Sequence, residues 1–297
     1  MNILSIKNLS FNYPNNKILK DINIHVDKGE VVSILGGSGV GKTTLFNIIA
    51  GINPLQSGEI SIKGNTDYKG RVSYMLQKDL LLEHKTIIQN IILPLLIRKI
   101  NKKEAEEEAI KNLKLFNLYE YKDKYPSELS GGMRQRVCIA MAVAGRPKIL
   151  ICDEPTTALD ITTEAQILRL MQTLAVEAGI GIIFISHNLR VIAQICDRVM
   201  VMYAGKCVES ATVEGIFNEP RHPYTLGLLL ALPQGKWHGE LKAVEGQPPD
   251  LFDLPRGCAF NPRCKWAMRI CGNRIPMVTN VGEGHQFTCW LAKLEGL

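Results

Sequence analysis

A glycine-rich octapeptide lies between an apolar run and a helical segment of this 297-residue chain. It reads Gly36–Gly37–Ser38–Gly39–Val40–Gly41–Lys42–Thr43, follows the expected strand Val31–Leu35 and opens the expected helix Thr44–Ala50. The pattern G-x-x-x-x-G-K-[ST] in this context is typical of a loop whose backbone N–H groups surround phosphate oxygens. Its lysine reaches the outer phosphates and its last hydroxyl ligates Mg²⁺. The loop therefore predicts binding of a nucleoside triphosphate.

Two acidic residues end an apolar strand farther along the chain. Asp153 and Glu154 directly follow Ile149–Cys152. Asp153 is placed to hold Mg²⁺ through water, and Glu154 to orient or deprotonate an attacking water. The alternative is that both residues only cap a helix that follows Pro155. Together with the phosphate-binding loop, the pair favours phosphoryl transfer, which needs charge neutralisation and an aligned nucleophile.

The pattern of apolar residues predicts an α/β fold. Short apolar strands at Ile149–Cys152 and Ile180–Ile185 flank the expected helix Thr163–Ala178, which is typical of a parallel sheet covered by helices. The N-terminal part predicts short strands at Ile3–Leu9 and Ile18–Val26.

Between these parts, the region at about 79–128 predicts helices. One of them has Asn101 as its cap and Glu104 three residues later. Beyond about residue 212, Pro and Gly become frequent and periodic structure fades.

Composition excludes several classes of protein. With 46% hydrophobic and 22% charged residues, the chain can form one large domain or a domain with an appendage. Residues 1–125 carry 18 Lys and Arg against 13 Asp and Glu, and residues 126–297 carry 17 against 16. Neither part has a basic stripe, so we expect no nucleic-acid partner.

No segment predicts a membrane span or a secretory signal. The best apolar run, Ile87–Ile100, is interrupted by polar residues and Pro94, and Met1–Ser10 lacks a basic start followed by an apolar core. We therefore expect a cytosolic chain.

A second phosphate cradle is predicted at Ser130–Gly131–Gly132, where two glycines follow a serine at the start of a helix. One mononucleotide site does not need two cradles. The economical interpretation is that this cradle serves a nucleotide held by another copy, in a head-to-tail dimer.

Taken in order, these motifs resemble the ATPase subunit of an ATP-binding cassette (ABC) transporter over about residues 1–230. Tyr13 matches the aromatic ring that stacks on adenine, and Gln77 matches the glutamine that senses Mg²⁺ and the transmembrane partner. Ser130–Gly132 matches the signature, Ala158–Leu159–Asp160 the loop that communicates across the dimer, and His187 the histidine that contacts the γ-phosphate. The resemblance implies a P-loop core, an antiparallel β subdomain and a helical subdomain at about 79–140.

The resemblance also implies a set of site residues. Glu154 and His187 are expected to be catalytic, and Thr43, Gln77 and Asp153 to bind Mg²⁺. The expected ATP contacts are Tyr13, Gly36, Gly37, Ser38, Gly39, Gly41, Lys42, Thr43, Thr44, Gln77, Ser130, Gly131, Gly132, Asp153 and Asp160.

The C-terminal part more specifically resembles the ATPases of oligopeptide, dipeptide and nickel importers. The likeness rests on Pro220–Arg221–His222–Pro223–Tyr224–Thr225, on Gly246–Gln247–Pro248–Pro249–Asp250 and on a cysteine-bearing end. We expect residues 231–297 to form an extension of this type.

All eight cysteines lie after residue 126, and disulfides are not expected in a cytosolic chain. Cys138, Cys152, Cys196 and Cys207 are expected to be small core residues. The last four cysteines could enclose a [4Fe–4S] cluster with a folding role, as in some members of this family, and zinc or no metal are the alternatives. These four are Cys258, Cys264, Cys271 and Cys289.

Residues 1–125, in contrast, resemble the ATPases of nitrate, sulfonate and thiamine-precursor importers. They contain 16 Lys and 2 Arg, whereas residues 126–297 contain 6 Lys and 11 Arg. This suggests a join near 116–130.

Together the resemblances imply a peripheral ATPase at the cytoplasmic face of the membrane. It would dimerise with itself or a paralogue, bind permease subunits and serve an extracytoplasmic binding protein indirectly. The expected cargo is oligopeptides, dipeptides or nickel. Alternatives are a nitrate- or sulfonate-type importer ATPase, a soluble ABC ATPase of DNA repair or translation, and an iron–sulfur sensor.

Overall fold

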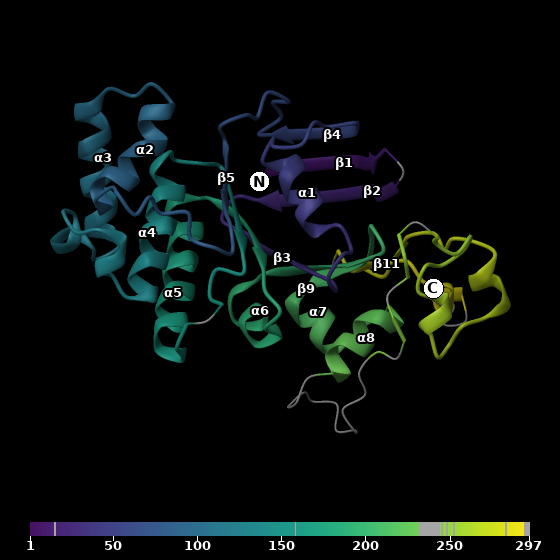
Figure 1. The fold of residues 1–297 in the computed structure, drawn as a ribbon. Helices are drawn as coiled ribbons and strands as arrows, with labels where there is room; N and C mark the ends of the chain where they lie inside the picture. Colours follow the sequence, from purple (N-terminus) through teal and green to yellow (C-terminus); the bar gives the residue numbers. More distant parts are fainter. Residues whose placement is uncertain are drawn as a thin grey trace. The chain divides into compact units, whose positions relative to one another are not determined.

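The computed structural model describes the chain except for residues 15, 158, 232–243, 245, 248, 252, 283 and 294–297. The chain forms two compact units, each assembled from several stretches of sequence. Figure 1 traces the chain by its position in the sequence. Unit 1 comprises Met1–Leu4, Val26–Val31 and Ile62–Ile185, and unit 2 comprises Ser5–His25, Val32–Ser61 and Ser186–Leu297.

Unit 1 contains three parallel strands, in the order β7 (Gly181–Ile185), β6 (Ile149–Asp153) and β5 (Val72–Met75). Every residue of β7 and all but the last of β6 are buried, as expected for parallel strands covered on both faces. Helix α5 (Ile161–Ala178) connects β6 to β7 and begins two residues before the expected start at Thr163. The expected strand–helix–strand unit with a parallel sheet is confirmed.

Three helices of unit 1 pack against one another: α2 (Ile87–Ile97), α3 (Lys102–Leu115) and α4 (Gly131–Ala144). Short 3₁₀ turns, η1 (Tyr119–Tyr121) and η2 (Pro126–Glu128), lie between α3 and α4. As expected, Asn101 caps α3, and its side chain accepts a hydrogen bond from Glu104 N at 2.9 Å. The Glu104 carboxylate bonds the Asn101 side-chain amide rather than its backbone N–H, at 3.0 Å.

Most of a three-stranded sheet belongs to unit 2. Its strand order is β2 (Asn16–Asp27), β1 (Asn2–Tyr13) and β4 (Ser57–Ile62). Buried residues alternate with exposed ones along β2, including Ile22, Ile24 and Val26. Both expected strands are longer than the sequence indicated, since β1 continues to Tyr13 and β2 begins at Asn16.

A second sheet of unit 2 has the order β10 (Thr279–Asn280), β11 (Gln286–Phe287), β9 (Lys206–Thr212), β8 (Arg198–Tyr203) and β3 (Val31–Leu35). Strands β3 and β8 are parallel, and the other pairs are antiparallel. The C-terminal residues thus add β10 and β11 to the edge at β9.

The helices of unit 2 are α1 (Lys42–Ile49), α6 (Leu189–Ile195), α7 (Val213–Asn218) and α8 (Pro223–Leu230). Helices α7 and α8 lie beyond residue 212, where the periodicity of apolar residues fades, and each is a short helix that begins at a side-chain cap. Among the described residues after them, regular structure comprises β10, β11 and three 3₁₀ turns, η3 (Asn261–Arg263), η4 (Arg269–Gly272) and η5 (Trp290–Lys293). None of the helices in the described ranges has both the length and the apolar character of a membrane span.

Candidate nucleotide site and cysteine cluster

The glycine-rich loop has a shape that side chains would disrupt. A Cβ added at Gly36 would lie 2.5 Å from Met202 O, and one added at Gly41 would lie 2.8 Å from Leu19 Cδ2. Gly41 has φ +102° and stands at the start of α1, where no side chain caps the helix. The loop can therefore present N–H groups and the positive end of α1 to an anion. Ser38 and Gly39, at its tip, are exposed.

Lys42 lies over this loop. Its Nζ donates hydrogen bonds to Gly36 O at 2.7 Å and Gly37 O at 2.8 Å. Thr43 is exposed in the first turn of α1, and Thr44 behind it is half-buried. A cation, a hydroxyl and a glycine-rich loop thus lie together, which suits a triphosphate with Mg²⁺.

Two further expected residues belong to unit 2. Tyr13 ends β1 with 45% of its surface exposed, and its ring makes an edge-to-face contact with Phe11 at 5.1 Å between centroids. His187 is exposed just before α6, next to the helix cap Asn188.

In unit 1 the structure brings Gln77 and Glu154 together. Gln77 Nε2 donates to Glu154 Oε2 at 3.0 Å, and Thr157 Oγ1 donates to the same oxygen at 3.0 Å. Glu154 has a left-handed backbone with φ +50°, which is uncommon for a non-glycine residue. Residues with such a strained backbone are often found at functional sites. The carboxylate is thus held by two donors beyond the end of β6.

Sequence reasoning missed a partner of Asp153. Tyr74 Oη donates to Asp153 Oδ2 at 3.2 Å. Burial and the charge of Asp153 raise the pKa of Tyr74, so its hydroxyl remains a donor. The alternative that Asp153 and Glu154 cap a helix after Pro155 is wrong, because the next helix begins at Ile161 and its cap is Asp160.

The Ser130–Gly131–Gly132 turn starts helix α4. Ser130 Oγ accepts a hydrogen bond from Met133 N at 3.4 Å, and both Ser130 and Gly131 are exposed. A Cβ at Gly132 would lie only 2.3 Å from Thr163 Cγ2 of α5. The turn is therefore accessible on one side and tightly packed on the other.

Asp160 caps the start of α5. Its carboxylate accepts hydrogen bonds from Thr162 Oγ1 and, at 2.9 and 2.7 Å, from Thr163 N and Oγ1. These bonds, that of Thr162 first, lower the pKa of Asp160. Ala158 of the same expected loop lies outside the described residues.

A charged clamp that sequence reasoning also missed joins α4 to the segment after Gln77. Arg134 donates to both oxygens of Asp79 at 2.8 and 2.9 Å, and to Glu83 at 2.7 Å. The hydrogen bonds from Arg134 lower the pKa of Asp79. The spacing of these residues, 55 and 51 positions apart, gives no signal in the sequence.

The last four cysteines line one small cavity of about 10 Å³, together with Phe260 and Trp290. Burial raises the pKa of Cys289 to about 11, and the other three thiols add to that rise. All eight cysteines are free thiols. No group of three or more His, Cys, Asp or Glu side chains within the described part of the chain is arranged to hold a metal ion. The four thiols thus line the same cavity. Their present spacing does not form a site for a single metal ion.

The other four cysteines lie apart. Cys152 and Cys196 are buried in the core, as expected. Cys138 and Cys207 are only half-buried, so they are not the core residues that the sequence predicted. Of the second C-terminal motif, Pro248 lies outside the described residues, and Gly246 has φ +78°.

Comparison with known proteins now identifies the family. Residues 19–157 match the ABC transporter family model, and residues 208–271 match the oligopeptide/dipeptide transporter C-terminal region. The chain is 39% identical to the oligopeptide transport ATP-binding protein OppD of Bacillus subtilis, over 97% of this chain and 88% of that protein. It is 36% identical to the probable D,D-dipeptide transport ATP-binding protein DdpD of Escherichia coli, over 99% of this chain and 98% of that protein.

The fold comparison agrees. A dimeric post-hydrolysis structure of the ATP-binding cassette MJ0796, bound to ADP and phosphate, is 29% identical with a TM-score of 0.62. That match covers 71% of this chain and 99% of the other. The alignments to the peptide-transport proteins extend across residues 116–130, where a join between two parentages was expected. The chain therefore belongs to the family of ATP-hydrolysing, ATP-binding subunits of ABC transporters.

Proposed function

We propose that this subunit powers the import of oligopeptides or dipeptides through a membrane permease, from a peripheral position at the cytoplasmic face. The observation that carries the cargo is the match of residues 208–271 to the oligopeptide/dipeptide transporter C-terminal region. Relatives named for oligopeptide and D,D-dipeptide transport support it, since they align with nearly the whole chain.

Radiolabelled di- and oligopeptide uptake into vesicles that contain the native permease tests the cargo. We expect ATP-dependent accumulation of peptide that stops when this subunit is omitted. Accumulation of nickel, nitrate or a sulfonate in place of peptide would contradict the proposal.

We further propose roles for the site residues in hydrolysis. The N–H groups of residues 36–43, except that of Gly37, bind the phosphates of ATP together with Lys42, Tyr13 stacks on adenine, and His187 contacts the γ-phosphate. Thr43, Gln77 and Asp153 hold Mg²⁺, which neutralises charge that develops during phosphoryl transfer. Support comes from the open start of α1 and from the hydroxyl of Tyr74, which fixes the Asp153 carboxylate.

Glu154 accepts the proton of the attacking water in this mechanism. Gln77 and Thr157 hold one carboxylate oxygen, so the group keeps a fixed orientation in which it can receive a proton. We expect Glu154→Gln to bind ATP within about twofold of wild type while kcat falls by about 10²–10⁴-fold.

The matched control is Glu177→Gln, the same change at an exposed position near the end of α5, with kcat unchanged. ATP affinity is measured by a fluorescent-nucleotide titration and hydrolysis by phosphate release. Wild-type turnover in Glu154→Gln would remove Glu154 from the mechanism.

A groove in unit 1 is proposed to receive a short apolar helix of the permease. It has a volume of about 280 Å³ and is lined by β5, by Leu80 and Leu81 after Gln77, and by Cys138 and Met141 of α4. Leu80 is 66% exposed, so most of this apolar side chain at the rim is open to a partner. The neighbouring Gln77 donates a hydrogen bond to Glu154. Docking of the permease helix beside Gln77 can therefore affect the position of the Glu154 carboxylate.

Leu80→Glu tests this docking. We expect the variant to lose co-purification with the permease from detergent-solubilised membranes, because a charge would enter an apolar contact. Leu115→Glu, at an exposed leucine that ends α3, is the control and should co-purify normally. Equal recovery of the permease with both variants would contradict the groove.

We also propose that Cys258, Cys264, Cys271 and Cys289 hold a [4Fe–4S] cluster that stabilises the extension. Support comes from the donor set, because four thiols on one cavity are the ligands such a cluster takes. The cavity is of single-water size, so cluster binding requires the cysteine segments to spread.

Iron, zinc and acid-labile sulfide analysis of anaerobically purified protein tests the cluster. We expect about four irons and four sulfides per wild-type chain, and fewer of both per chain in a Cys271→Ser variant. Zinc, or metal-free protein of unchanged stability, would contradict the assignment.

A further inference from the structure

One peptide group of the phosphate-binding loop is held from both sides. Gly37 N donates to Tyr224 Oη at 3.0 Å, and the carbonyl of the same peptide group, Gly36 O, accepts from Lys42 Nζ at 2.7 Å. In a trans peptide the N–H and C=O point in opposite directions. Tyr224 therefore fixes the orientation of the peptide group on which Lys42 rests.

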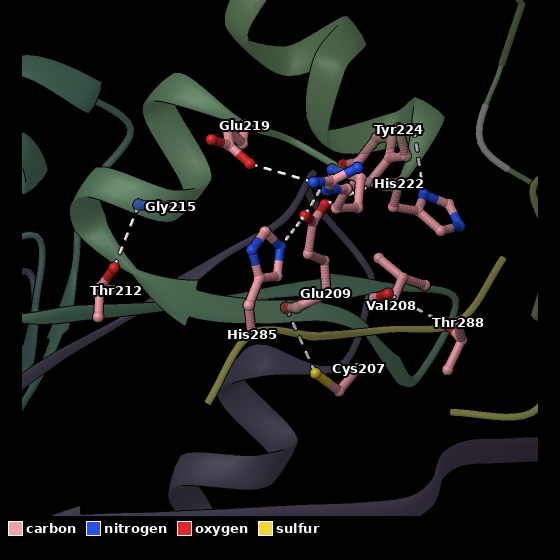
Figure 2. Close-up of polar contacts among 11 residues, drawn as sticks. Cys207, Val208, Glu209, Thr212, Gly215, Glu219, His222, Tyr224, His285 and Thr288 are labelled. Carbon is pink, nitrogen blue, oxygen red and sulfur yellow. Dashed lines mark hydrogen bonds and ion pairs between the residues drawn. The ribbon is translucent and has the colours of Figure 1, made fainter. Parts of the chain in front are cut away.

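Tyr224 is carried to the loop by a short, strongly anchored segment. It is the second residue of α8, whose cap His222 accepts a hydrogen bond from Tyr224 N at 3.1 Å through Nδ1. The backbone N–H groups of Arg221 and His222 donate to the Glu209 carboxylate at 2.7 and 2.9 Å. Glu209 is fully buried, and Figure 2 shows how its side chain faces this segment from β9.

The C-terminal extension contacts this anchor at two points. The Phe260 ring lies 5.5 Å from the ring of Tyr224 and 5.8 Å from that of His222, between centroids. His285 Nε2 lies 2.7 Å from Glu209 Oε1 (Figure 2). Phe260 also lines the cavity of the four cysteines, together with His222 and Pro223, so that cavity lies directly against the segment that carries Tyr224.

We propose that Tyr224 is a positioning residue for the phosphate-binding loop, and that the C-terminal extension sets its position through Phe260 and His285. The inference rests on the proposed function, because it requires residues 36–43 to bind ATP. It gives the segment Arg221–Tyr224 a task, since Arg221 and His222 anchor the turn and Tyr224 reaches the loop. The extension thereby acts on ATP affinity rather than on the chemical step.

Tyr224→Phe is the sharpest test, because it keeps the buried ring and removes only the oxygen. Gly37 N–H then loses its partner and the loop loses its fixed orientation before ATP arrives. We expect KM and Kd for ATP to rise about three- to tenfold, while kcat and the unfolding midpoint change little. Tyr121→Phe, at an exposed tyrosine of unit 1, is the control and should match wild type.

Phe260→Leu tests the second half of the inference. We expect it to raise KM for ATP and to increase deuterium uptake in a peptide covering residues 36–41, because Tyr224 loses its ring contact with Phe260 and keeps that with Tyr203. This exchange measurement also serves if Tyr224→Phe does not fold. Unchanged uptake in residues 36–41 would overturn the role of the extension.

Lys42→Ala separates this inference from the proposed function. If Lys42→Ala binds ATP like wild type, the function assigned to the loop fails. If Lys42→Ala loses ATP binding but Tyr224→Phe keeps wild-type KM and Kd, only the positioning role of Tyr224 is wrong.

Discussion

The residue type at some positions of this protein is constrained by contacts with residues that are distant in sequence. Gly132 is the clearest case, since its φ is ordinary and only the 2.3 Å approach of Thr163 Cγ2 excludes a side chain. Glu154 is the opposite case, because a bulky residue takes a left-handed backbone where it is held by Gln77 and Thr157. Packing excludes a side chain at Gly132, and polar contacts hold the strained backbone of Glu154.

Gly132→Ala tests the packing at the start of α4. We expect it to lower the free energy of unfolding by about 1–3 kcal/mol, because a methyl group would overlap Thr163. The double variant Gly132→Ala, Thr163→Ser removes the clashing methyl and should recover most of that loss. Urea denaturation of the four proteins measures the coupling, and strictly additive effects would contradict the contact.

His222 makes stability depend on pH. Burial lowers its pKa to about 4, against an opposing effect of Glu209, so the folded protein keeps this ring neutral. The unfolded chain binds the proton near pH 6.5, and the free energy of unfolding therefore falls as pH drops from about 6.5 to about 4. From pH 7.5 to pH 5 we expect a loss of about 2 kcal/mol from this residue.

His222→Asn keeps a hydrogen-bond acceptor for Tyr224 N but does not titrate. The pH dependence of its urea denaturation should be flatter than that of wild type by about the same amount. Parallel curves for the two proteins would show that His222 is not the titrating group.

At the scale of elements, the Arg134 clamp joins the segment after Gln77, which is expected to contact the permease, to helix α4, which begins at the expected phosphate-binding turn. Asp79 and Glu83 follow Gln77, and Arg134 is in the first turns of α4, which starts at the Ser130 turn. The clamp therefore holds the segment after Gln77 against the start of α4. Arg134 and Asp79 are only 22% and 28% exposed, so solvent weakens this pair less than a surface pair.

Arg134→Lys keeps the charge and removes the two-pronged geometry. We expect a loss of about 1 kcal/mol in the free energy of unfolding, smaller at high salt. Because the pKa of Asp79 is lowered, this contribution is present at neutral pH and is lost below about pH 4. Arg146→Lys is the control: Arg146 is 75% exposed in its pair with Glu108, and the change should have almost no effect.

At the scale of the whole molecule, the Ser130 turn is exposed at the surface of this chain. Its N–H groups lie at the start of the 14-residue helix α4, and the MJ0796 cassette is dimeric in its solved structure. We propose that the turn binds the γ-phosphate of an ATP held by a second copy or a paralogue.

Glu154→Gln with ATP and Mg²⁺ is therefore expected to form a dimer in light-scattering measurements, and to remain monomeric without nucleotide. Adding Ser130→Asp keeps a good helix cap but places a negative charge against the phosphates. This double variant should stay monomeric with ATP. A strictly monomeric Glu154→Gln, or a dimer that ignores Ser130→Asp, would contradict the shared site.

Local sequence alone determined the glycine-rich loop, the buried strands Ile149–Asp153 and Gly181–Ile185 and the Asn101 cap, because each depends on residues a few positions apart. Tertiary structure decided what lies across from them. Gln77 meets Glu154 across 77 positions and Tyr224 meets Gly37 across 187, and no periodicity or spacing encodes such pairs. The same holds for Glu209, whose burial looks unfavourable until three partners, two just before α8 and one in the extension, surround it. A hydrogen bond needs its partners within about 3 Å, and only the folded chain brings distant residues that close.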